Sequence, residues 1–196
     1  MGHSKADKAA SRDRVLQIAA RMVREEGVTR PGIADLMKEA GLTHGGFYKH
    51  FASRDELITQ ATELALTEGT ANMERAARKN EEAPRAGVID AYLAERHRES
   101  PGTGCALVTL GVAAGRGDQH LKEAYEQQIR TYLGLLTDLD DGSEDARAEA
   151  MVTLSAMVGA VLMARAMADH DLSDELLKTV ADRLKRRTPE TAAAAG

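Results

Sequence analysis

The sequence predicts an all-α protein with short helices at its N-terminus and a larger helical body after them. Apolar residues recur at helical spacing through most of the 196-residue chain, and this spacing is the main sequence signal for amphipathic helices. No alternating run of β-branched residues indicates a strand. Glycine, proline and capping residues separate the apolar stretches. These three observations predict about nine helices and no sheet.

Three short helices are expected first. The first ends at Gly27, because glycine favours the position just after a helix. The second covers Ile33–Ala40 and ends at Gly41. The third runs from His44 to about His50, after Thr43 as its N-terminal cap. The apolar stripe of the first helix consists of Val15, Ile18, Ala19, Met22 and Val23.

Longer amphipathic helices are expected after residue 53. Ser53 and Glu56 have the spacing of a capping box, which opens a helix that continues towards Lys79. Pro84 suits the start of the next helix. A Pro-Gly-Thr-Gly break precedes an apolar helix that begins at Cys105. The remaining expected features are helices over 121–139 and 148–168, a turn at 140–143, and a last helix capped by Asp171 or Ser173 that ends at 185–187.

Charge divides the chain into a basic head and an acidic body. Residues 1–55 carry ten Lys and Arg against seven Asp and Glu, while the remainder carries sixteen against twenty-four. A basic head favours an anionic partner. We therefore expect an anion-binding domain over 1–55, a larger helical domain over 56–187, and a flexible tail over 188–196.

Composition also bears on the compartment. The single cysteine excludes an intrachain disulfide, as expected in a reducing environment. The N-terminus has no apolar core of the signal-peptide type. The most apolar stretch, Ala156–Ala168, contains Arg165 and is expected to be too short to span a membrane. The sequence therefore predicts a cytoplasmic protein without a membrane partner.

The stretch GLTHGGFYKHF, residues 41–51, has the arrangement of a helix-turn-helix motif, with glycine in its turn. The second helix of such a motif enters the DNA major groove. Gly45 and Gly46 have no side chain to hold the backbone away from DNA. Phe47 is expected to face inward, and Tyr48 to place its hydroxyl on a phosphate. The candidate DNA-binding residues are Thr43, His44, Gly45, Gly46, Tyr48, Lys49, His50 and Arg54.

The longer stretch IADLMKEAGLTHGGFYKHFASRDEL resembles the DNA-binding signature of the TetR family of transcriptional regulators. The pattern departs from the family at two places: Pro31-Gly32 and Gly46 stand where the family often has Thr or Ser. The resemblance covers about a quarter of the chain. The positions that carry it are Leu36, Ala40, Gly41, Leu42, Thr43, Gly45, Phe47, Tyr48, His50, Phe51, Ser53, Arg54 and Leu57.

The resemblance implies that the body binds a small-molecule effector and forms a homodimer. Small residues at Ser155 and Gly159 on an apolar helix, followed by an amphipathic last helix, independently favour a four-helix dimer seam. The alternative is that these stripes form intramolecular core only. The candidate effector-binding residues, each of which also suits plain core, are Met73, Tyr92, Cys105, Leu110, Tyr125, Ile129 and Met163.

The leading hypothesis is a ligand-responsive regulator, of repressor type, that binds a palindromic operator in double-stranded DNA. Cys105 stands at a predicted helix start, where a thiol pKa is lowered, so a thiol or electrophile sensor is an alternative that requires a partly exposed thiol. The simpler alternative for Cys105 is a buried, inert thiol. An enzyme with Cys105 as nucleophile and His97 as base is a further alternative, and a DNA-packaging protein is disfavoured by the acidic body. We expect no enzyme activity, cofactor, metal site or catalytic residue.

Overall fold

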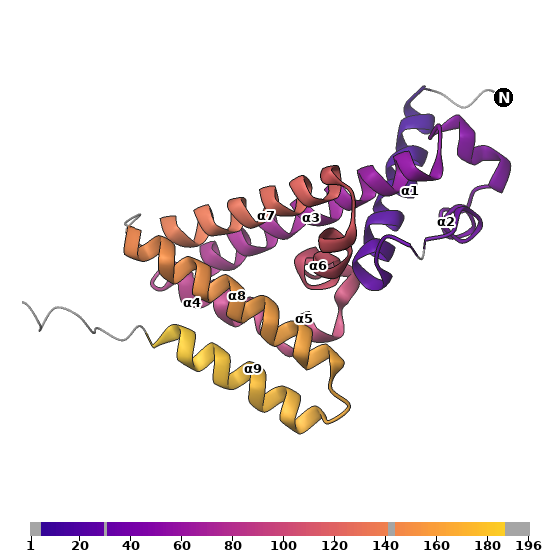
Figure 1. Ribbon diagram of the computed structural model, residues 1–196. Helices are drawn as coiled ribbons and strands as arrows, with labels where there is room; N and C mark the ends of the chain where they lie inside the picture. Colours follow the sequence, from indigo (N-terminus) through magenta and orange to yellow (C-terminus); the bar gives the residue numbers. More distant parts are fainter. Residues whose placement is uncertain (1–4, 30, 141–143, 187–196) are drawn as a thin grey trace, which may run out of the picture. The chain divides into compact units, whose positions relative to one another are not determined.

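The computed structural model describes residues 5–29, 31–140 and 144–186, and every regular element in these ranges is a helix. Figure 1 shows their arrangement along the chain. The elements are α1 (Lys5–Glu26), α2 (Ile33–Glu39), the 3₁₀ helix η1 (His44–Lys49), α3 (Arg54–Lys79), α4 (Pro84–Tyr92), α5 (Glu95–Glu99), the 3₁₀ helix η2 (Pro101–Thr103), α6 (Ala106–Arg116), α7 (Gln119–Asp138), α8 (Glu144–Ala166) and α9 (His170–Lys185).

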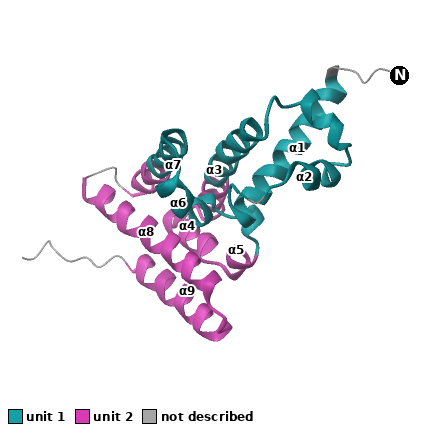
Figure 2. Cartoon of the chain, turned by 45° about the vertical axis from the view of Figure 1, so that its right-hand side comes forward, with its two compact units in different colours: residues 1–71, 100–131 teal, residues 72–99, 132–196 magenta. Residues whose placement is uncertain are grey.

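The chain forms two compact units, shown in different colours in Figure 2. Unit 1 comprises residues 1–71 and 100–131, and unit 2 comprises residues 72–99 and 132–196. This division differs from the expected boundary near residue 55. The reason is that α3 continues through that boundary without a break, while α6 and η2 pack on α1 within unit 1.

The core of the head is built by α1, α2 and η1. The helix α1 is longer than expected and ends at Gly27, whose φ of +83° is a conformation that glycine adopts without strain. Val15, Ala19 and Val23 of the predicted stripe are buried, while Ile18 and Met22 are half-buried. The buried set includes Val15, Ala19, Val23, Leu36, Met37, Phe47, Phe51 and Leu57.

The capping box at the start of α3 is confirmed. The Glu56 backbone N–H donates to the Ser53 hydroxyl at 3.0 Å, and the Ala52 N–H donates to the Glu56 carboxylate at 2.7 Å. The first bond satisfies an amide group of the first turn of α3, and the second ties Glu56 to the residue before the Ser53 cap, one position earlier than in a standard capping box. The start of α3 is therefore fixed by its own sequence.

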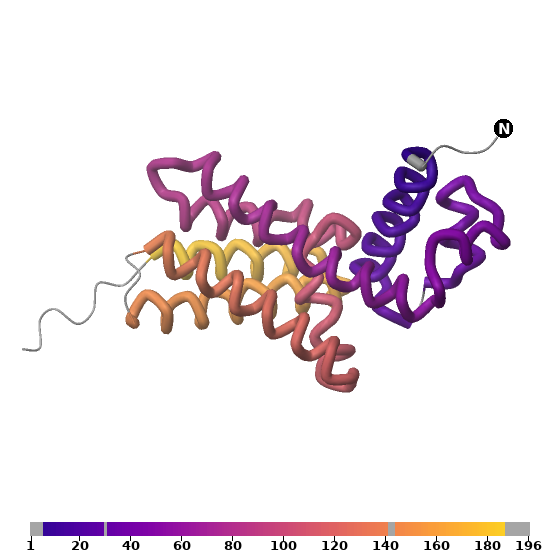
Figure 3. Tube along the Cα trace, turned by 90° about the horizontal axis from the view of Figure 1, so that it is seen from above, coloured from indigo at the N-terminus to yellow at the C-terminus, as the bar shows by residue number. Residues whose placement is uncertain are grey.

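In unit 2, α8 and α9 run side by side, as both Figure 1 and Figure 3 show. The start of α9 differs from the expectation. Asp169 is the cap, and its carboxylate accepts from the Leu172 N–H at 3.1 Å. Asp171 lies two residues later, inside the first turn of α9. The Ser173 hydroxyl is buried and donates instead to the carbonyl oxygen of Ala164 at 3.1 Å.

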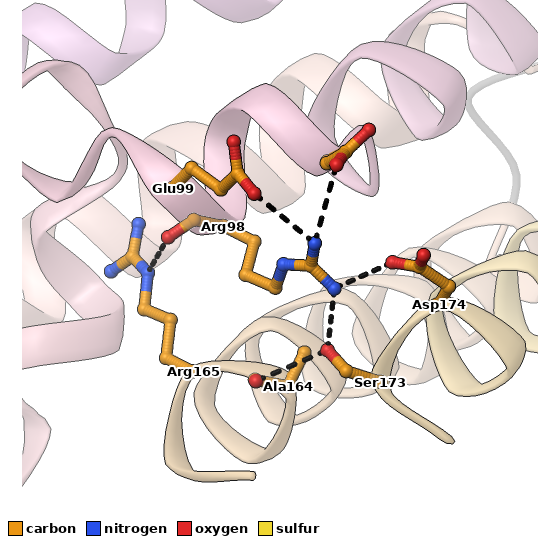
Figure 4. Close-up of polar contacts among 7 residues, drawn as sticks. Arg98, Glu99, Ala164, Arg165, Ser173 and Asp174 are labelled. Atoms are coloured by element: carbon orange, nitrogen blue, oxygen red, sulfur yellow. Dashed lines mark hydrogen bonds and ion pairs between the residues drawn. The ribbon is translucent and has the colours of Figure 1, made fainter. Parts of the chain in front are cut away.

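A buried arginine joins the short helix α5 to α9. The Arg98 guanidinium donates to the Ser173 hydroxyl at 2.8 Å and to the Asp174 carboxylate at 2.5 Å (Figure 4). Arg165 of α8 donates in turn to the carbonyl oxygens of His97 and Arg98. Since buried polar groups must be paired, this network fixes α5 against α8 and α9.

The helix α8 spans 23 residues and extends well before the apolar stretch that the sequence suggested. In the part of the chain that the structure describes, it is the one helix long and apolar enough to cross a membrane, a test that the core helix of a soluble protein also passes. The helix predicted over 148–168 is confirmed, with a start four residues earlier and an end two residues earlier. Eight of its residues are buried, including Thr153, whose hydroxyl accepts from Arg85 at 2.6 Å.

The third helix is a 3₁₀ helix and not an α-helix, and α5 and η2 were not expected as helices. The predicted turn at 140–143 lies outside the described residues except for Asp140, and the predicted tail 188–196 lies wholly outside them.

Candidate nucleic-acid interface

The turn between α2 and η1 is closed by backbone hydrogen bonds at Gly41. Its N–H donates to the carbonyl oxygen of Lys38 at 3.1 Å, and the Leu42 N–H donates to that of Met37 at 2.8 Å. These two bonds define a Schellman motif, which requires a left-handed residue. Gly41 supplies it with a φ of +69°. The turn thus sets the angle at which η1 leaves α2.

Two phenylalanines hold η1 on the head. Phe47 is fully buried, and its ring lies 5.7 Å from that of Phe51. The Tyr48 ring meets Phe47 edge-on at 5.2 Å, yet 66% of Tyr48 is exposed. The predicted core role of the phenylalanines is confirmed. The Tyr48 hydroxyl is carried on the outer side of η1, where it could donate a hydrogen bond to a phosphate oxygen.

The two glycines of η1 differ in what surrounds them. A Cβ added at Gly45 would meet nothing within 4 Å, so no neighbouring helix requires a glycine there. A Cβ at Gly46 would lie 3.5 Å from the Thr43 hydroxyl and 3.6 Å from the Met37 methyl group, which is ordinary contact. A close approach to another part of this protein therefore does not explain Gly45, whereas close approach to DNA would.

The candidate side chains around η1 point into solvent. Thr43, His44 and Lys49 are exposed. Thr43 stands at the N-cap position, but its side chain makes no capping hydrogen bond, so the predicted capping bond is absent and its hydroxyl is available to an external acceptor. This set forms a polar surface around the N-terminal end of η1, where helix-turn-helix proteins contact base edges.

His50 differs from this set. Its ring is partly buried, and its Nδ1 is shielded from water and has no hydrogen-bond partner among the described residues. Burial lowers the pKa of His50, and the charges of Lys8, Arg12 and Lys49 lower this pKa further. The imidazole is thus neutral at pH 7, and the positive charge expected from His50 is absent.

Lys8, Arg12 and Lys49 form a basic cluster that was not predicted from the sequence. Lys8 and Arg12 of α1 stand four residues apart and gather with Lys49 near His50. The Arg12 guanidinium also lies 4.8 Å from the centre of the Phe51 ring and donates to Gln60 at 2.7 Å. The i, i+4 spacing of two basic residues before the first apolar stripe was the signal available in the sequence.

Arg54 was predicted to contact DNA, but in the structure its guanidinium has hydrogen-bond partners within the protein. Its guanidinium donates to the carbonyl oxygens of Pro31 at 3.1 Å, Thr29 at 3.0 Å and Val28 at 3.3 Å. These bonds tie the start of α3 to the turn between α1 and α2. A DNA contact by Arg54 stays a prediction, while its observed partners assign it to holding the turn before α2.

The candidate effector residues are divided between the units. In unit 1, Cys105 and Leu110 are buried, Ile129 is half-buried, and the Tyr125 hydroxyl donates to the Leu107 carbonyl oxygen at 3.1 Å. Burial raises the pKa of Tyr125, and nearby Cys105 raises it further. Unit 1 therefore brings Cys105 and Tyr125 together.

In unit 2, Met73 and Tyr92 are buried, and Met163 is half exposed on α8. The Tyr92 ring meets the His97 ring edge-on at 4.6 Å. Burial lowers the pKa of His97 to about 4, and its Nδ1 lies 2.5 Å from the Tyr92 carbonyl oxygen. A base with this pKa and this partner is poorly suited to activate a nucleophile.

Cys105 occupies the N-cap position of α6, as expected, but it is only 5% exposed. The sensor hypothesis required a partly exposed thiol. Burial of this degree instead matches the alternative of an inert core thiol. Among the described residues, no group of three or more His, Cys, Asp and Glu side chains is arranged to hold a metal ion.

The fold and this surface define a helix-turn-helix protein with a helical C-terminal portion. Residues 15–61 match the family described as bacterial regulatory proteins, tetR family. The chain also resembles a TetR-family transcriptional regulator from Streptomyces coelicolor of known structure, with a TM-score of 0.69 and 25% identity over 95% of this chain and 96% of that one. Residues 15–61 of this chain therefore resemble the DNA-binding part of tetR-family regulators.

Two curated relatives match short segments of the chain. The uncharacterized HTH-type transcriptional regulator YvdT of Bacillus subtilis is 36% identical over 55 residues, which are 28% of this chain and 28% of YvdT. The HTH-type transcriptional repressor KstR2 of Mycolicibacterium smegmatis is 33% identical over 52 residues, 26% of this chain and 25% of KstR2. The similarity thus spans about a quarter of these relatives.

Proposed function

We propose that this chain is a sequence-specific DNA-binding transcriptional regulator that acts as a homodimer and is released from its operator by a small effector. The observation that carries the proposal is the surface of η1: exposed His44, Tyr48 and Lys49 on a glycine-containing turn, held in place by buried Phe47. The likeness of a 52-residue segment to the KstR2 repressor supports repression as the direction of control.

The proposed contacts have different tasks. Tyr48, Thr43 and the basic cluster of Lys8, Arg12 and Lys49 contact phosphates, which gives affinity without sequence preference. His44 reads base edges, and Gly45 and Gly46 let the backbone approach the groove floor. Arg54 acts by holding the α1–α2 turn. The proposed DNA-binding domain is residues 1–55, with effector binding and dimerisation assigned to 56–187.

The homodimer is supported by an exposed apolar surface on α8 and α9. Met151, Val152, Leu162, Met163 and Leu172 are between 45% and 60% exposed. A Cβ at Gly159 would meet nothing within 4 Å inside the chain, so a partner helix has room to approach. Apolar side chains gathered on adjacent helices favour association. A twofold dimer would present two heads to two half-sites of a palindrome.

Two experiments test this function. Selection from a random duplex library should enrich one palindrome, with half-site centres separated by whole helical turns. Sedimentation at micromolar concentration should give a dimer, and Val152→Asp with Leu162→Asp should give a folded monomer with weak operator binding. Enrichment of no common sequence would remove the regulator proposal, and a monomeric wild type would remove the dimer.

The effector site is proposed in the body, where the candidate residues named above include the neighbours Cys105 and Tyr125. Because its target is DNA, the protein is proposed to act in the cytoplasm.

A further inference from the structure

Unit 1 contains a pocket of about 320 Å³ that the proposed DNA contacts do not use. Its walls come from the turn between α1 and α2, the first half of α3, the turn between α6 and α7, and the start of α7. Its size is that of a site for a small organic molecule. The apolar part of the lining consists mainly of Val28, Ile58, Leu121 and Ala124.

A buried hydroxyl belongs to the wall of this pocket. Thr62 lines it and is only 4% exposed, and its Oγ1 has no hydrogen-bond partner among the described residues. Buried hydroxyl groups in folded proteins are nearly always hydrogen-bonded. A helical threonine that is buried and unpaired at the edge of a pocket therefore marks a position at which a ligand can supply the missing partner.

The charges around the pocket favour a cation. Three carboxylates line it: Asp55, Glu63 and Asp118. Two basic side chains also line it, and the Arg54 guanidinium, which keeps its positive charge, lies 3.9 Å from the Asp55 carboxylate. Arg54 donates to three backbone carbonyl oxygens, and the His120 Nε2 lies 3.1 Å from the Glu63 carboxylate. An anionic ligand would meet an excess of negative charge, whereas a monocation would be stabilised by it.

We propose that this pocket binds small organic monocations that carry an apolar body, of the arylalkylammonium type. The apolar part of the ligand lies against Ile58 and Leu121. Its ammonium group donates a hydrogen bond to the Thr62 hydroxyl and is neutralised by Glu63, the next residue of α3. His120 contacts this carboxylate and therefore competes with the ligand for it.

The test is an NMR titration of the full-length protein, without DNA, with phenethylammonium at pH 7. Saturable shifts are expected at the amides of 58–63 and 117–124. The neutral 2-phenylethanol should bind about tenfold more weakly, since it lacks the charge that Glu63 neutralises. The anion phenylacetate should not bind.

Matched variants separate the pocket from a general effect of charge. Glu63→Gln should weaken phenethylammonium binding about tenfold, while Glu126→Gln, an equal charge change on α7 away from the lining, should leave it unchanged. His120→Ala should strengthen binding several-fold, because it frees the Glu63 carboxylate.

Thr62→Val provides a readout that a purely structural role would not give. It replaces an unpaired hydroxyl by a methyl group of the same shape, so the melting temperature should hold or rise. Phenethylammonium binding should nevertheless weaken about tenfold. No saturable shifts, equal affinity in Glu63→Gln, or equal binding of phenylacetate would overturn the proposal. Since the titration contains no DNA, its failure would leave the proposed regulatory function untouched.

Discussion

The Arg24 guanidinium donates through Nε to the carbonyl oxygen of Gly102 at 2.6 Å. The same side chain donates through Nη1 to Glu68 at 2.7 Å, and the Thr109 hydroxyl donates to the Arg24 carbonyl oxygen at 2.7 Å. The C-terminal end of α1 is therefore bonded to η2, α3 and α6. Because Arg24 is 6% exposed, these bonds are shielded from water.

Replacement of Arg24 should be costly. Arg24→Met leaves the Gly102 carbonyl and the Glu68 carboxylate without this donor, and we expect a loss of about 2–3 kcal/mol in the free energy of unfolding. Arg14 is exposed on the same helix, so Arg14→Met should change that free energy by less than about 0.5 kcal/mol. Urea unfolding measures both, and equal losses would contradict the role assigned to Arg24.

Two glycines provide a matched pair for packing. A Cβ at Gly87 of α4 would lie 2.8 Å from the Ala76 carbonyl oxygen and 2.9 Å from the Asn80 Cβ. Backbone must move to admit it, so Gly87→Ala should cost about 1–3 kcal/mol. Gly115, inside α6, has nothing within 4 Å of its Cβ position, so Gly115→Ala should stabilise by about 0.5–1 kcal/mol. Thermal unfolding should give shifts of opposite sign.

Gly45→Ala separates folding from DNA binding. Its added methyl group meets open space, so the melting temperature should stay within about 2 °C of the wild type. If the backbone at Gly45 approaches the groove, operator affinity should fall at least about tenfold. Unchanged affinity on the selected palindrome, measured by fluorescence anisotropy, would place this part of η1 away from DNA.

Tyr48→Phe and Lys49→Ala test the same surface of η1 through its side chains. Both side chains are exposed, so neither change should alter stability. A phosphate contact at Tyr48 predicts weaker binding to all sequences alike, while Lys49→Ala should also reduce the dependence of affinity on salt. Normal binding by both variants would remove η1 as the recognition element.

Burial of His97 predicts a dependence of stability on pH. Burial is the main cause that lowers its pKa to about 4, with Arg165 and Arg96 adding to it, from an ordinary value of 6.5. The unfolded chain therefore binds this proton first, and the free energy of unfolding falls as pH drops from 6.5 towards 4. The free energy of unfolding of the wild type should fall by up to about 3 kcal/mol more than that of His97→Gln over that pH range. Parallel profiles in urea unfolding would contradict this pKa.

Burial of Cys105 predicts slow alkylation. At 5% exposure the thiol should resist iodoacetamide for hours in native protein and react at once in urea. Cys105→Ser should lower stability, because it buries a hydroxyl in place of a thiol. Rapid labelling of the native protein would instead revive the sensor hypothesis.

Local sequence signals predicted the elements that depend on local interactions. The capping box at Ser53 and the stop at Gly41 are each set within a few residues, and both were read correctly. The cap of α9 was not, since Asp169, Asp171 and Ser173 are all suitable caps. The choice between them depends on Arg98, which is distant in sequence and takes the Ser173 hydroxyl.

The same distinction applies to the candidate site. Burial of Phe47 and exposure of Tyr48 follow from the pattern of η1. The neutral state of His50 and the carbonyl partners of Arg54 depend on residues of other elements, namely Lys8, Arg12 and the α1–α2 turn. Such tertiary neighbours decide whether a basic side chain is available to DNA, and no motif specifies them.

We propose that this protein recognises one DNA sequence through its helix-turn-helix. The most direct test is the ratio of dissociation constants for the selected palindrome and a scrambled duplex of equal length, measured from about 50 to 200 mM salt. We expect the palindrome to bind at least about a thousandfold more tightly than the scrambled duplex at physiological salt. Equal affinities that fall together as salt rises would show charge-driven binding alone and would contradict it.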